Sequence, residues 1–217
     1  MTQDTPSEEP RSVLWYAWDL PNRYSMVGLV CAALGIYFAI LGNFPAAMIG
    51  LVWAVAFDWF DGRVARGMKG RTARQREFGE QLDSIIDVIS FGVAPAVLLL
   101  SAGGFSPWFL PGAFVVLFAS TARLAYFNVF GLAEGSTYRG LALDNNMIIL
   151  VALFALRPVL GASAFAVVLY VALVGLSVLN VSPLRTPKFG GKWYFVILAY
   201  AVVMSVFYGG QLLANAG

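Results

Sequence analysis

The sequence contains no histidine, a single cysteine and few charged residues. Without histidine, the chain lacks the commonest general base and the commonest metal ligand, so proton transfer or metal binding must rest on carboxylates. The single cysteine, Cys31, excludes a disulfide within the chain. Charged residues make up 12% of the 217 residues, whereas hydrophobic residues reach 59%. A soluble domain usually carries about twice that charged share, so the composition predicts an all-α polytopic membrane protein.

Long apolar runs predict about seven membrane-spanning helices. The Arg157-Pro158 pair leaves open whether the fifth and sixth runs are two spans joined by a loop or one kinked segment. Counted as separate spans, the runs lie at roughly residues 24–42, 45–66, 79–102, 107–129, 141–157, 162–181 and 193–214.

The residues before the first span divide into a polar part and an aromatic part. Residues 1–10 are polar and acidic, and we expect a disordered tail there. Residues 11–25 mix aromatic and charged side chains. This mixture indicates either an interfacial helix broken at Pro21 or an ordinary aromatic belt before the first span. We therefore predict a cytoplasmic tail with an interfacial helix over 1–23, and a single transmembrane domain over 24–217.

The basic residues gather on one side of the predicted spans. With the N-terminus in the cytoplasm, the opposite side keeps only Arg157. Because loops rich in Lys and Arg stay in the cytoplasm, we predict a cytoplasmic N-terminus and polar chemistry on the cytoplasmic face. The cytoplasmic set is Arg11, Arg23, the basic residues of 63–76, Arg123, Arg139, Arg185, Lys188 and Lys192.

Carboxylates stand at helical spacing at the ends of two predicted spans. The first stripe has the spacing i, i+3, i+4, i+7 and i+8 and comprises Asp58, Asp61, Gly62, Ala65 and Arg66. The second has the spacing i, i+4 and i+8 and comprises Gly79, Asp83 and Asp87. If the two helices pack as an antiparallel hairpin, four carboxylates converge near the membrane surface.

Four carboxylates in a low-dielectric site need neutralisation. Oxygen ligands without histidine or cysteine suit Mg²⁺, Mn²⁺ or Ca²⁺ rather than Zn²⁺, and four carboxylates could hold two such ions. The small residues on the stripes leave room for a ligand, and Arg66 would reach a phosphate. The alternatives are solvated or capping aspartates and glycines that only allow close helix packing. The basic cluster Arg63, Lys69, Arg71, Arg74 and Arg76 indicates a topology determinant that meets anionic headgroups rather than the alternative, a part of the catalytic site.

The two stripes together resemble the motif of the CDP-alcohol phosphotransferases. The resemblance covers Asp58-x2-Asp61-Gly62-x2-Ala65-Arg66 and then Gly79-x3-Asp83-x3-Asp87. It departs from the family in the twelve residues 67–78, which are more than the family usually has there and indicate a longer loop. The family implies a core of six helices, formed here by the first six spans, with 193–214 as an addition, and makes 24–217 one catalytic domain.

The resemblance also implies a role for each residue of the motif. Two divalent cations, Mg²⁺ or Mn²⁺ or else Ca²⁺, would be bound by the aspartates: Asp58, Asp61 and Asp83 hold one, and Asp58, Asp83 and Asp87 hold or approach the other. Asp87 would be the general base that takes the proton of the acceptor hydroxyl. The cytidine would lie against Gly62, Ala65 and Gly79, with Arg66 on the phosphates and CMP as leaving group.

Two further stretches resemble the bacterial and archaeal phosphatidylserine synthases. They are LDSIIDVISFGVAPAVLLL at 82–100 and ARLAYFNV at 122–129. This resemblance implies CDP-diacylglycerol as donor, L-serine as acceptor, contact with membrane lipids and no nucleic acid partner. It also implies a homodimer, and a bacterial inner membrane fits best.

The acceptor pocket is where the resemblance weakens. In YRGLALDNNMI at 138–148, Asp144 and Asn145 stand at the start of a predicted helix, where the relatives tend to have Gly-Leu-Pro. These residues belong either to an altered acceptor pocket or to an N-terminal helix cap. Arg123 and Asn128 could touch the acceptor carboxylate or the donor. The same chemistry with choline, glycerol 3-phosphate or an inositol phosphate stays open, as does a cation carrier that uses the aspartates.

Overall fold

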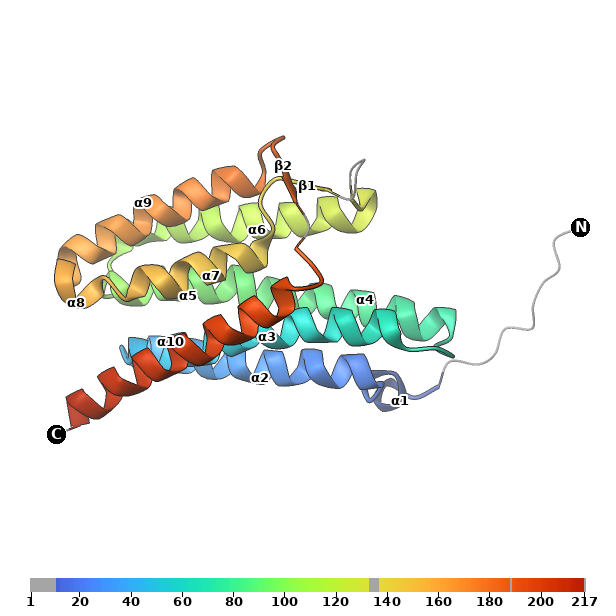
Figure 1. Cartoon of the computed structure of the whole chain (residues 1–217). Coiled ribbons are helices and arrows are strands. Elements are labelled where there is room, and N and C mark those ends of the chain that lie inside the picture. Colours follow the sequence, from blue (N-terminus) through green and yellow to red (C-terminus); the bar gives the residue numbers. More distant parts are fainter. Residues whose placement is uncertain (1–10, 133–136, 188, 217) are drawn as a thin grey trace, which may run out of the picture.

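The computed structural model describes residues 11–132, 137–187 and 189–216. The predicted tail at 1–10 and Lys188 lie outside these residues. The described chain is almost entirely helical (Figure 1). Its elements in chain order are α1 (Val13–Ala17), α2 (Leu20–Ile40), α3 (Phe44–Gly67), α4 (Ala73–Asp87), the π-helix η1 (Val88–Val93), α5 (Ala94–Ala102), the 3₁₀ turn η2 (Pro107–Phe109), α6 (Leu110–Phe130), β1 (Thr137–Arg139), α7 (Leu143–Phe154), α8 (Arg157–Leu160), α9 (Ala162–Asn180), β2 (Arg185–Pro187) and α10 (Trp193–Ala216).

Six helical segments of the described residues are long and apolar enough to cross a membrane. They are 20–40, 44–67, 73–102, 107–130, 162–180 and 193–214. The predicted fifth span differs, because α7 has only 12 residues and ends in a turn before α8. Beyond Gly161 the chain reverses into α9, so the Arg157-Pro158 pair lies in a connection between two helices (Figure 1). An all-α polytopic membrane protein is confirmed.

Three helix boundaries differ from the predictions. Pro21 lies in the first turn of α2, where its missing N–H needs no partner, so it begins the first span and does not break an interfacial helix. Asp19 is the N-cap of that helix, and the helix that precedes it is the short α1. The helix that carries the second aspartate stripe begins at Ala73 rather than 79, because Thr72 and Gln75 form a reciprocal capping box. The expected long loop therefore shrinks to residues 68–72.

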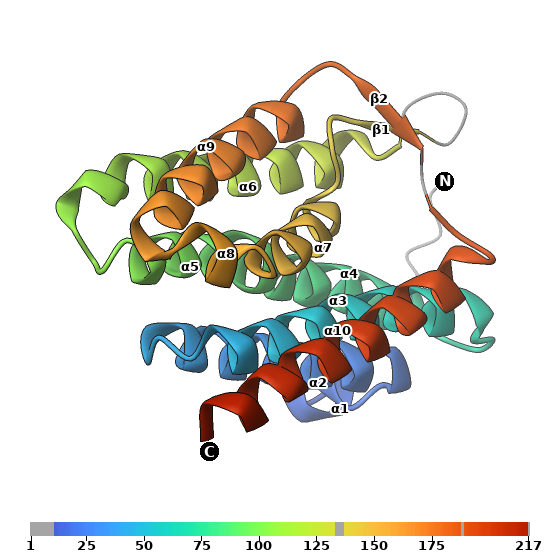
Figure 2. The same ribbon diagram turned by 60° about the vertical axis from the view of Figure 1, so that its left-hand side comes forward.

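The helices form two groups with a shared middle layer. In both views α2, α3 and α10 lie on one side, α6 and α9 lie on the other, and α4, α5 and α7 lie between them (Figures 1 and 2). The buried core lies between the middle layer and its neighbours, with Leu51 and Val55 of α3, Leu98 of α5 and Leu150 of α7 fully buried. The parts of α3 and α4 that carry the two aspartate stripes lie towards one end of this packed bundle.

The last helix, α10, is tied to the core by side-chain hydrogen bonds. The Trp53 indole donates to Ser205 Oγ at 3.0 Å. The hydroxyls of Tyr200 and Tyr208 donate to the carbonyls of Ile148 and Val151 in α7, at 2.8 and 2.5 Å. These bonds hold α10 against α3 and α7, so the helix expected as an addition is part of the bundle.

A short antiparallel pairing joins two connections at the same end of the bundle. Tyr138 of β1 pairs with Thr186 of β2, which links the α6–α7 connection to the α9–α10 connection. Thr186 Oγ1 also donates to the Gly140 carbonyl at 2.7 Å. This pairing holds Tyr138 beside the polar ends of α3 and α4.

Candidate active site

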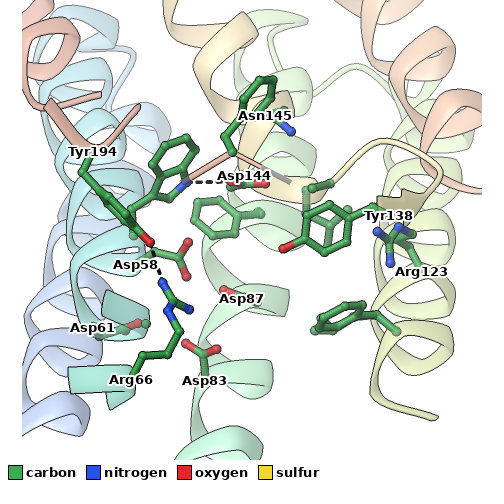
Figure 3. Close-up of a pocket in the computed structure, with 18 residues that line it drawn as sticks. Asp58, Asp61, Arg66, Asp83, Asp87, Arg123, Tyr138, Asp144, Asn145 and Tyr194 are labelled. Atoms are coloured by element: carbon green, nitrogen blue, oxygen red, sulfur yellow. Dashed lines mark hydrogen bonds between the residues drawn. The ribbon is translucent and has the colours of Figure 1, made fainter. Parts of the chain in front are cut away.

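The two aspartate stripes face each other, as their spacing predicted. α3 supplies Asp58 and Asp61, and α4 supplies Asp83 and Asp87 (Figure 3). One carboxylate oxygen from each of Asp58, Asp83 and Asp87 lies within 4.8 Å of the other two. The π-helix η1 begins directly after Asp87, and such insertions in helices frequently mark functional sites.

Asp61 occupies a different position from the other three aspartates. It is 5% exposed and accepts a hydrogen bond of 2.5 Å from the Ser25 hydroxyl of α2. It lies outside the close group of three oxygens, although its side chain still borders the same cavity. A role for Asp61 as a metal ligand stays a prediction.

The three clustered aspartates fit a divalent metal ion. Asp87 Oδ1 is buried and has no hydrogen-bond partner among the described residues. A buried carboxylate oxygen without a partner is costly, and a hard cation would satisfy it. The donor set contains oxygen only, which suits Mg²⁺ or Mn²⁺. The cluster is therefore compatible with divalent metal binding.

A cavity extends from the aspartates towards α6 and α7, and we call it the catalytic cavity. Its polar walls are Asp58, Asp61, Asp83 and Asp87 on one side, and Arg123, Asp144 and Asn145 on the other. Figure 3 shows these side chains converging from four helices. Among the predicted acceptor residues, Asn128 does not line it. That side chain is exposed, and its amide donates to Ser84 Oγ at 2.9 Å.

Arg123 is buried between two aromatic rings at the edge of the catalytic cavity. Its guanidinium carbon lies 5.7 Å from the ring centroid of Phe127 and 5.6 Å from that of Tyr138. The side chain is 6% exposed, and its Nε has no hydrogen-bond partner among the described residues. Burial and the neighbouring Asp144 carboxylate raise the pKa of Tyr138 to about 12, so this phenol stays protonated at neutral pH. Arg123 is thus a buried cation that an anionic ligand group could pair with.

Asp144 lies in the first turn of α7 but does not cap it. The N-cap residue is Ala142, with no side-chain cap bond, so Asp144 is not the N-cap, although it lies at the positive end of the helix dipole as the cap alternative also expected. The Asp144 carboxylate accepts a hydrogen bond of 2.7 Å from the Trp59 indole of α3. Asp144 and Asn145 both line the catalytic cavity, as the altered-pocket alternative predicted.

A second pocket adjoins the catalytic cavity. It is lined by all four residues predicted for the CDP moiety, Gly62, Ala65, Arg66 and Gly79. Asp61, Gly62, Arg66 and Asp83 line both spaces, so the two are adjacent. A Cβ on Gly79 would lie 2.9 Å from Arg71 Nη2 and 2.9 Å from Asn22 Oδ1. The glycine therefore lets both side chains approach the α4 backbone at the wall of this pocket.

Aromatic residues that the sequence did not single out complete the site. The Arg66 guanidinium donates to the Tyr194 hydroxyl at the start of α10, and Arg63 lies 5.2 Å from the Tyr194 ring centroid. The Trp59 and Tyr194 rings pack edge to face at 5.9 Å. Tyr194 directly follows Trp193 near Lys192, a pattern that also describes an ordinary aromatic belt. The sequence alone does not distinguish a site residue at Tyr194 from an ordinary aromatic belt residue.

The chain is similar in sequence to known proteins. A family model described as CDP-alcohol phosphatidyltransferase matches residues 18–216. An archaetidylserine synthase of Methanothermobacter thermautotrophicus is 34% identical over 176 residues, which are 79% of this chain and 71% of the relative. A CDP-diacylglycerol–serine O-phosphatidyltransferase of Methanocaldococcus jannaschii is 31% identical over 183 residues, 84% of this chain and 80% of the relative. A protein of the same name from Bacillus subtilis is 25% identical over 173 residues, 78% and 90% of the two chains.

Proposed function

This chain belongs to the CDP-alcohol phosphatidyltransferase family, and we propose that it transfers a phosphatidyl group from CDP-diacylglycerol to the hydroxyl of L-serine. The products are phosphatidylserine and CMP. The names of the similar proteins support serine as acceptor. The observation that carries the proposal is one cavity that holds the aspartate cluster together with Arg123 and Asp144.

Asp87 is the general base of the proposed reaction. The serine oxygen bonds to the phosphatidyl phosphorus, and the bond from that phosphorus to the CMP oxygen breaks. The hydroxyl proton passes to a carboxylate oxygen of Asp87 and from there to solvent. The buried Asp87 Oδ1 without a partner supports this role as well as a role in metal binding.

Two divalent cations, Mg²⁺ or Mn²⁺, complete the proposed site. Asp58, Asp83 and Asp87 would hold one ion, and Asp61 would join Asp58 and Asp83 around the other. When bound, the ions neutralise the diphosphate and the negative charge that develops on the leaving CMP. Arg66 adds a positive charge at the junction of the catalytic cavity and the second pocket.

The acceptor side of the catalytic cavity matches an amino acid better than the alternative acceptors. Arg123 is a buried cation for the carboxylate, and Asp144 is an anion for the ammonium group. Choline has no carboxylate for Arg123 to pair with. Glycerol 3-phosphate and inositol phosphate have no ammonium group for Asp144 and would bring a second phosphate towards its carboxylate.

We further propose how the protein sits in its membrane. The excess of Lys and Arg supports a cytoplasmic N-terminus and an active site that faces the cytoplasm of a bacterial inner membrane. A homodimer is proposed from the family resemblance. The polar chemistry and the basic residues lie at the same end of the bundle, which supports this orientation.

A CMP-release assay tests the proposed function. The purified chain in detergent receives CDP-diacylglycerol and Mg²⁺ or Mn²⁺, with serine, choline, inositol, inositol phosphate and glycerol 3-phosphate supplied in separate reactions. Release with serine alone is expected. Release with another acceptor would retain the family chemistry and overturn serine. If no acceptor led to CMP release, the proposed phosphatidyl transfer would be wrong, and a cation carrier that uses the aspartates would be favoured.

A further inference from the structure

Arg71 is buried in an ion pair in the segment where this chain is longer than the family motif. Its Nε lies 2.6 Å from Asp19 Oδ2, and both side chains are only 7% exposed. An arginine this buried cannot contact lipid headgroups. The expectation that the basic cluster meets anionic headgroups is therefore wrong for Arg71. Asp19 stands at the start of α2, and Arg71 precedes α4. The pair therefore joins the first span to the connection between the two aspartate helices.

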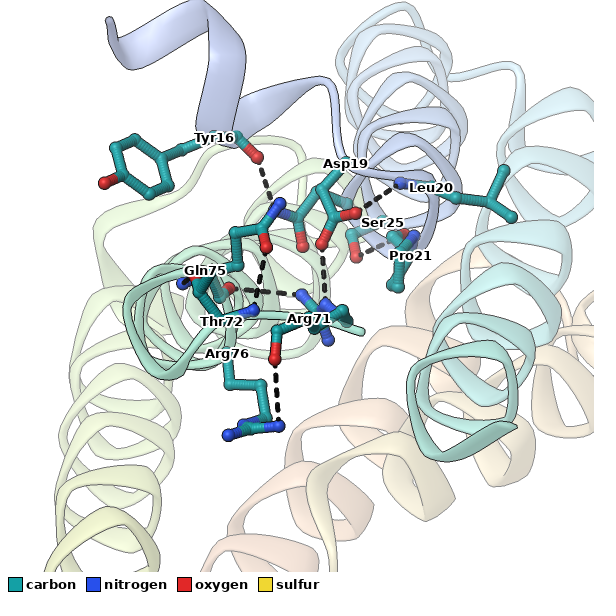
Figure 4. Close-up of polar contacts among 10 residues, drawn as sticks. Tyr16, Asp19, Leu20, Pro21, Ser25, Arg71, Thr72, Gln75 and Arg76 are labelled. Carbon is teal, nitrogen blue, oxygen red and sulfur yellow. Dashed lines mark hydrogen bonds and ion pairs between the residues drawn. The ribbon is translucent and has the colours of Figure 1, made fainter. Parts of the chain in front are cut away.

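The Arg71 guanidinium is held from two sides (Figure 4). Besides the Asp19 contact, its Nη2 donates to the Gln75 carbonyl at 3.2 Å. Gln75 is itself fixed, because its side chain accepts from the Thr72 backbone at 2.9 Å and its backbone donates to Thr72 Oγ1 at 3.1 Å. These bonds fix the direction in which the guanidinium points.

That direction is the Gly79 wall of the second pocket. Arg71 and Asn22 line this pocket, and Arg71 Nη2 and Asn22 Oδ1 each lie 2.9 Å from the position of a Cβ on Gly79. The Asn22 amide nitrogen donates to the Tyr16 carbonyl at 2.9 Å, which turns the amide oxygen towards Gly79. A donor and an acceptor therefore lie together against Gly79 at the wall of the pocket.

Arg71 lies apart from the phosphate side of the pocket. Asp61, Gly62, Arg66 and Asp83 line both cavities, whereas Arg71 lines only the second. A CDP group whose diphosphate reaches the aspartates would place its base towards Arg71.

The donor–acceptor pair is complementary to the hydrogen-bonding edge of cytosine. Cytosine offers an amino donor at N4 beside acceptors at N3 and O2, whereas uracil has an acceptor at position 4 and a donor at N3. Resting on the proposed use of a CDP donor, we propose that Arg71, positioned by Asp19, is a specificity-determining residue that acts with Asn22 to select cytosine over uracil. Arg71 donates to the base acceptors, and Asn22 Oδ1 accepts from the amino group.

The test compares the binding of CMP and UMP to the full chain in detergent with Mg²⁺ by calorimetry. The wild-type chain is expected to prefer CMP. Arg71→Gln and Asp19→Asn are each expected to lower the ratio of CMP to UMP affinity about tenfold or more, because a charge-assisted hydrogen bond is lost or misdirected. Arg74→Gln is the matched control, since Arg74 is exposed in the same segment and lines neither cavity.

The outcomes separate this inference from the proposed function. An unchanged ratio in a variant that keeps the wild-type melting temperature would overturn the role of Arg71. If Arg71→Gln fails to fold, Asp19→Asn decides, because it keeps both the size of the side chain and the arginine. An equal loss of ratio in Arg74→Gln would also overturn it. A wild-type chain that binds no CMP and releases none from CDP-diacylglycerol would overturn the proposed function as well.

Discussion

The Trp59 indole of α3 donates a hydrogen bond of 2.7 Å to Oδ2 of Asp144 in α7, a residue 85 positions away in the sequence. Trp59 directly follows Asp58, the first aspartate of the motif, and Asp144 opens α7. The bond therefore holds the acceptor side of the catalytic cavity in register with the aspartate cluster. It also leaves the Asp144 carboxyl group at the cavity wall with a single side-chain donor among the described residues.

Asp144→Asn should weaken acceptor binding more than turnover. Loss of a charge-assisted contact to the serine ammonium is expected to raise the KM for serine by about tenfold to a hundredfold. The KM for CDP-diacylglycerol should change little. Steady-state CMP release with each substrate varied separately measures both constants. A rise in the donor KM with an unchanged serine KM would contradict an acceptor role.

Trp59→Phe is the companion variant for the same hydrogen bond. It keeps an aromatic ring against Tyr194 but removes the indole donor to Asp144. If Trp59 acts by positioning Asp144, the serine KM should rise by a smaller factor than in Asp144→Asn, and the double variant should resemble Asp144→Asn alone. Additive effects would show that the two residues act independently.

Asp87→Asn should abolish turnover while retaining part of the nucleotide binding. Loss of a general base typically lowers the rate by about a hundredfold to ten-thousandfold, and loss of one carboxylate weakens metal binding without removing Asp58 and Asp83. CMP binding by calorimetry and CMP release from CDP-diacylglycerol measure the two effects in one preparation. Near-normal turnover in Asp87→Asn would refute the general base.

Metal removal should stop the reaction, and Asp58→Ala should imitate it. Asp58 contributes to the only group of three or more clustered metal-ligand side chains found in the described part of the chain. Chelation with EDTA is expected to abolish CMP release, and added Mg²⁺ or Mn²⁺ should restore it. In Asp58→Ala, metal-dependent binding of CDP-diacylglycerol and activity should be lost together. Full activity in EDTA, or metal-dependent donor binding in Asp58→Ala, would oppose the proposed ligand role.

The convergence of Asp58, Asp83 and Asp87 was predictable because helix periodicity decides which side chains share a face, whereas periodicity did not separate Asp61 from this group. Asp58 and Asp61 lie one turn apart, as do Asp83 and Asp87, and short connections bring the two helices together. The pairing of Asp19 with Arg71 had no such signal, since 52 residues separate the partners and one lies in a connection. The contact between Tyr194 and Arg66 was not predictable for another reason. An aromatic residue at the start of a membrane helix is ordinary, and only the tertiary contact with Arg66 distinguishes it.

Close packing of α2 against α3 places a strict size limit at Gly50. A Cβ there would lie 2.7 Å from the Cys31 carbonyl oxygen and 3.0 Å from the Gly35 backbone nitrogen. Both are backbone atoms, which cannot move away as the end of a flexible side chain can. Since α3 carries Asp58 and Asp61 while α2 carries Ser25, separating these helices would disturb the site as well as the packing.

Gly50→Ala should therefore lower both stability and activity. Overpacking of this kind costs about 1–3 kcal/mol, which should appear as a lower melting temperature in detergent and as reduced CMP release. Gly175→Ala is the control, because a Cβ there meets no atom within 4 Å. That variant should melt at or slightly above the wild-type temperature, since alanine favours a helix more than glycine does. Equal melting temperatures for the two variants would show that α2 and α3 can separate without cost.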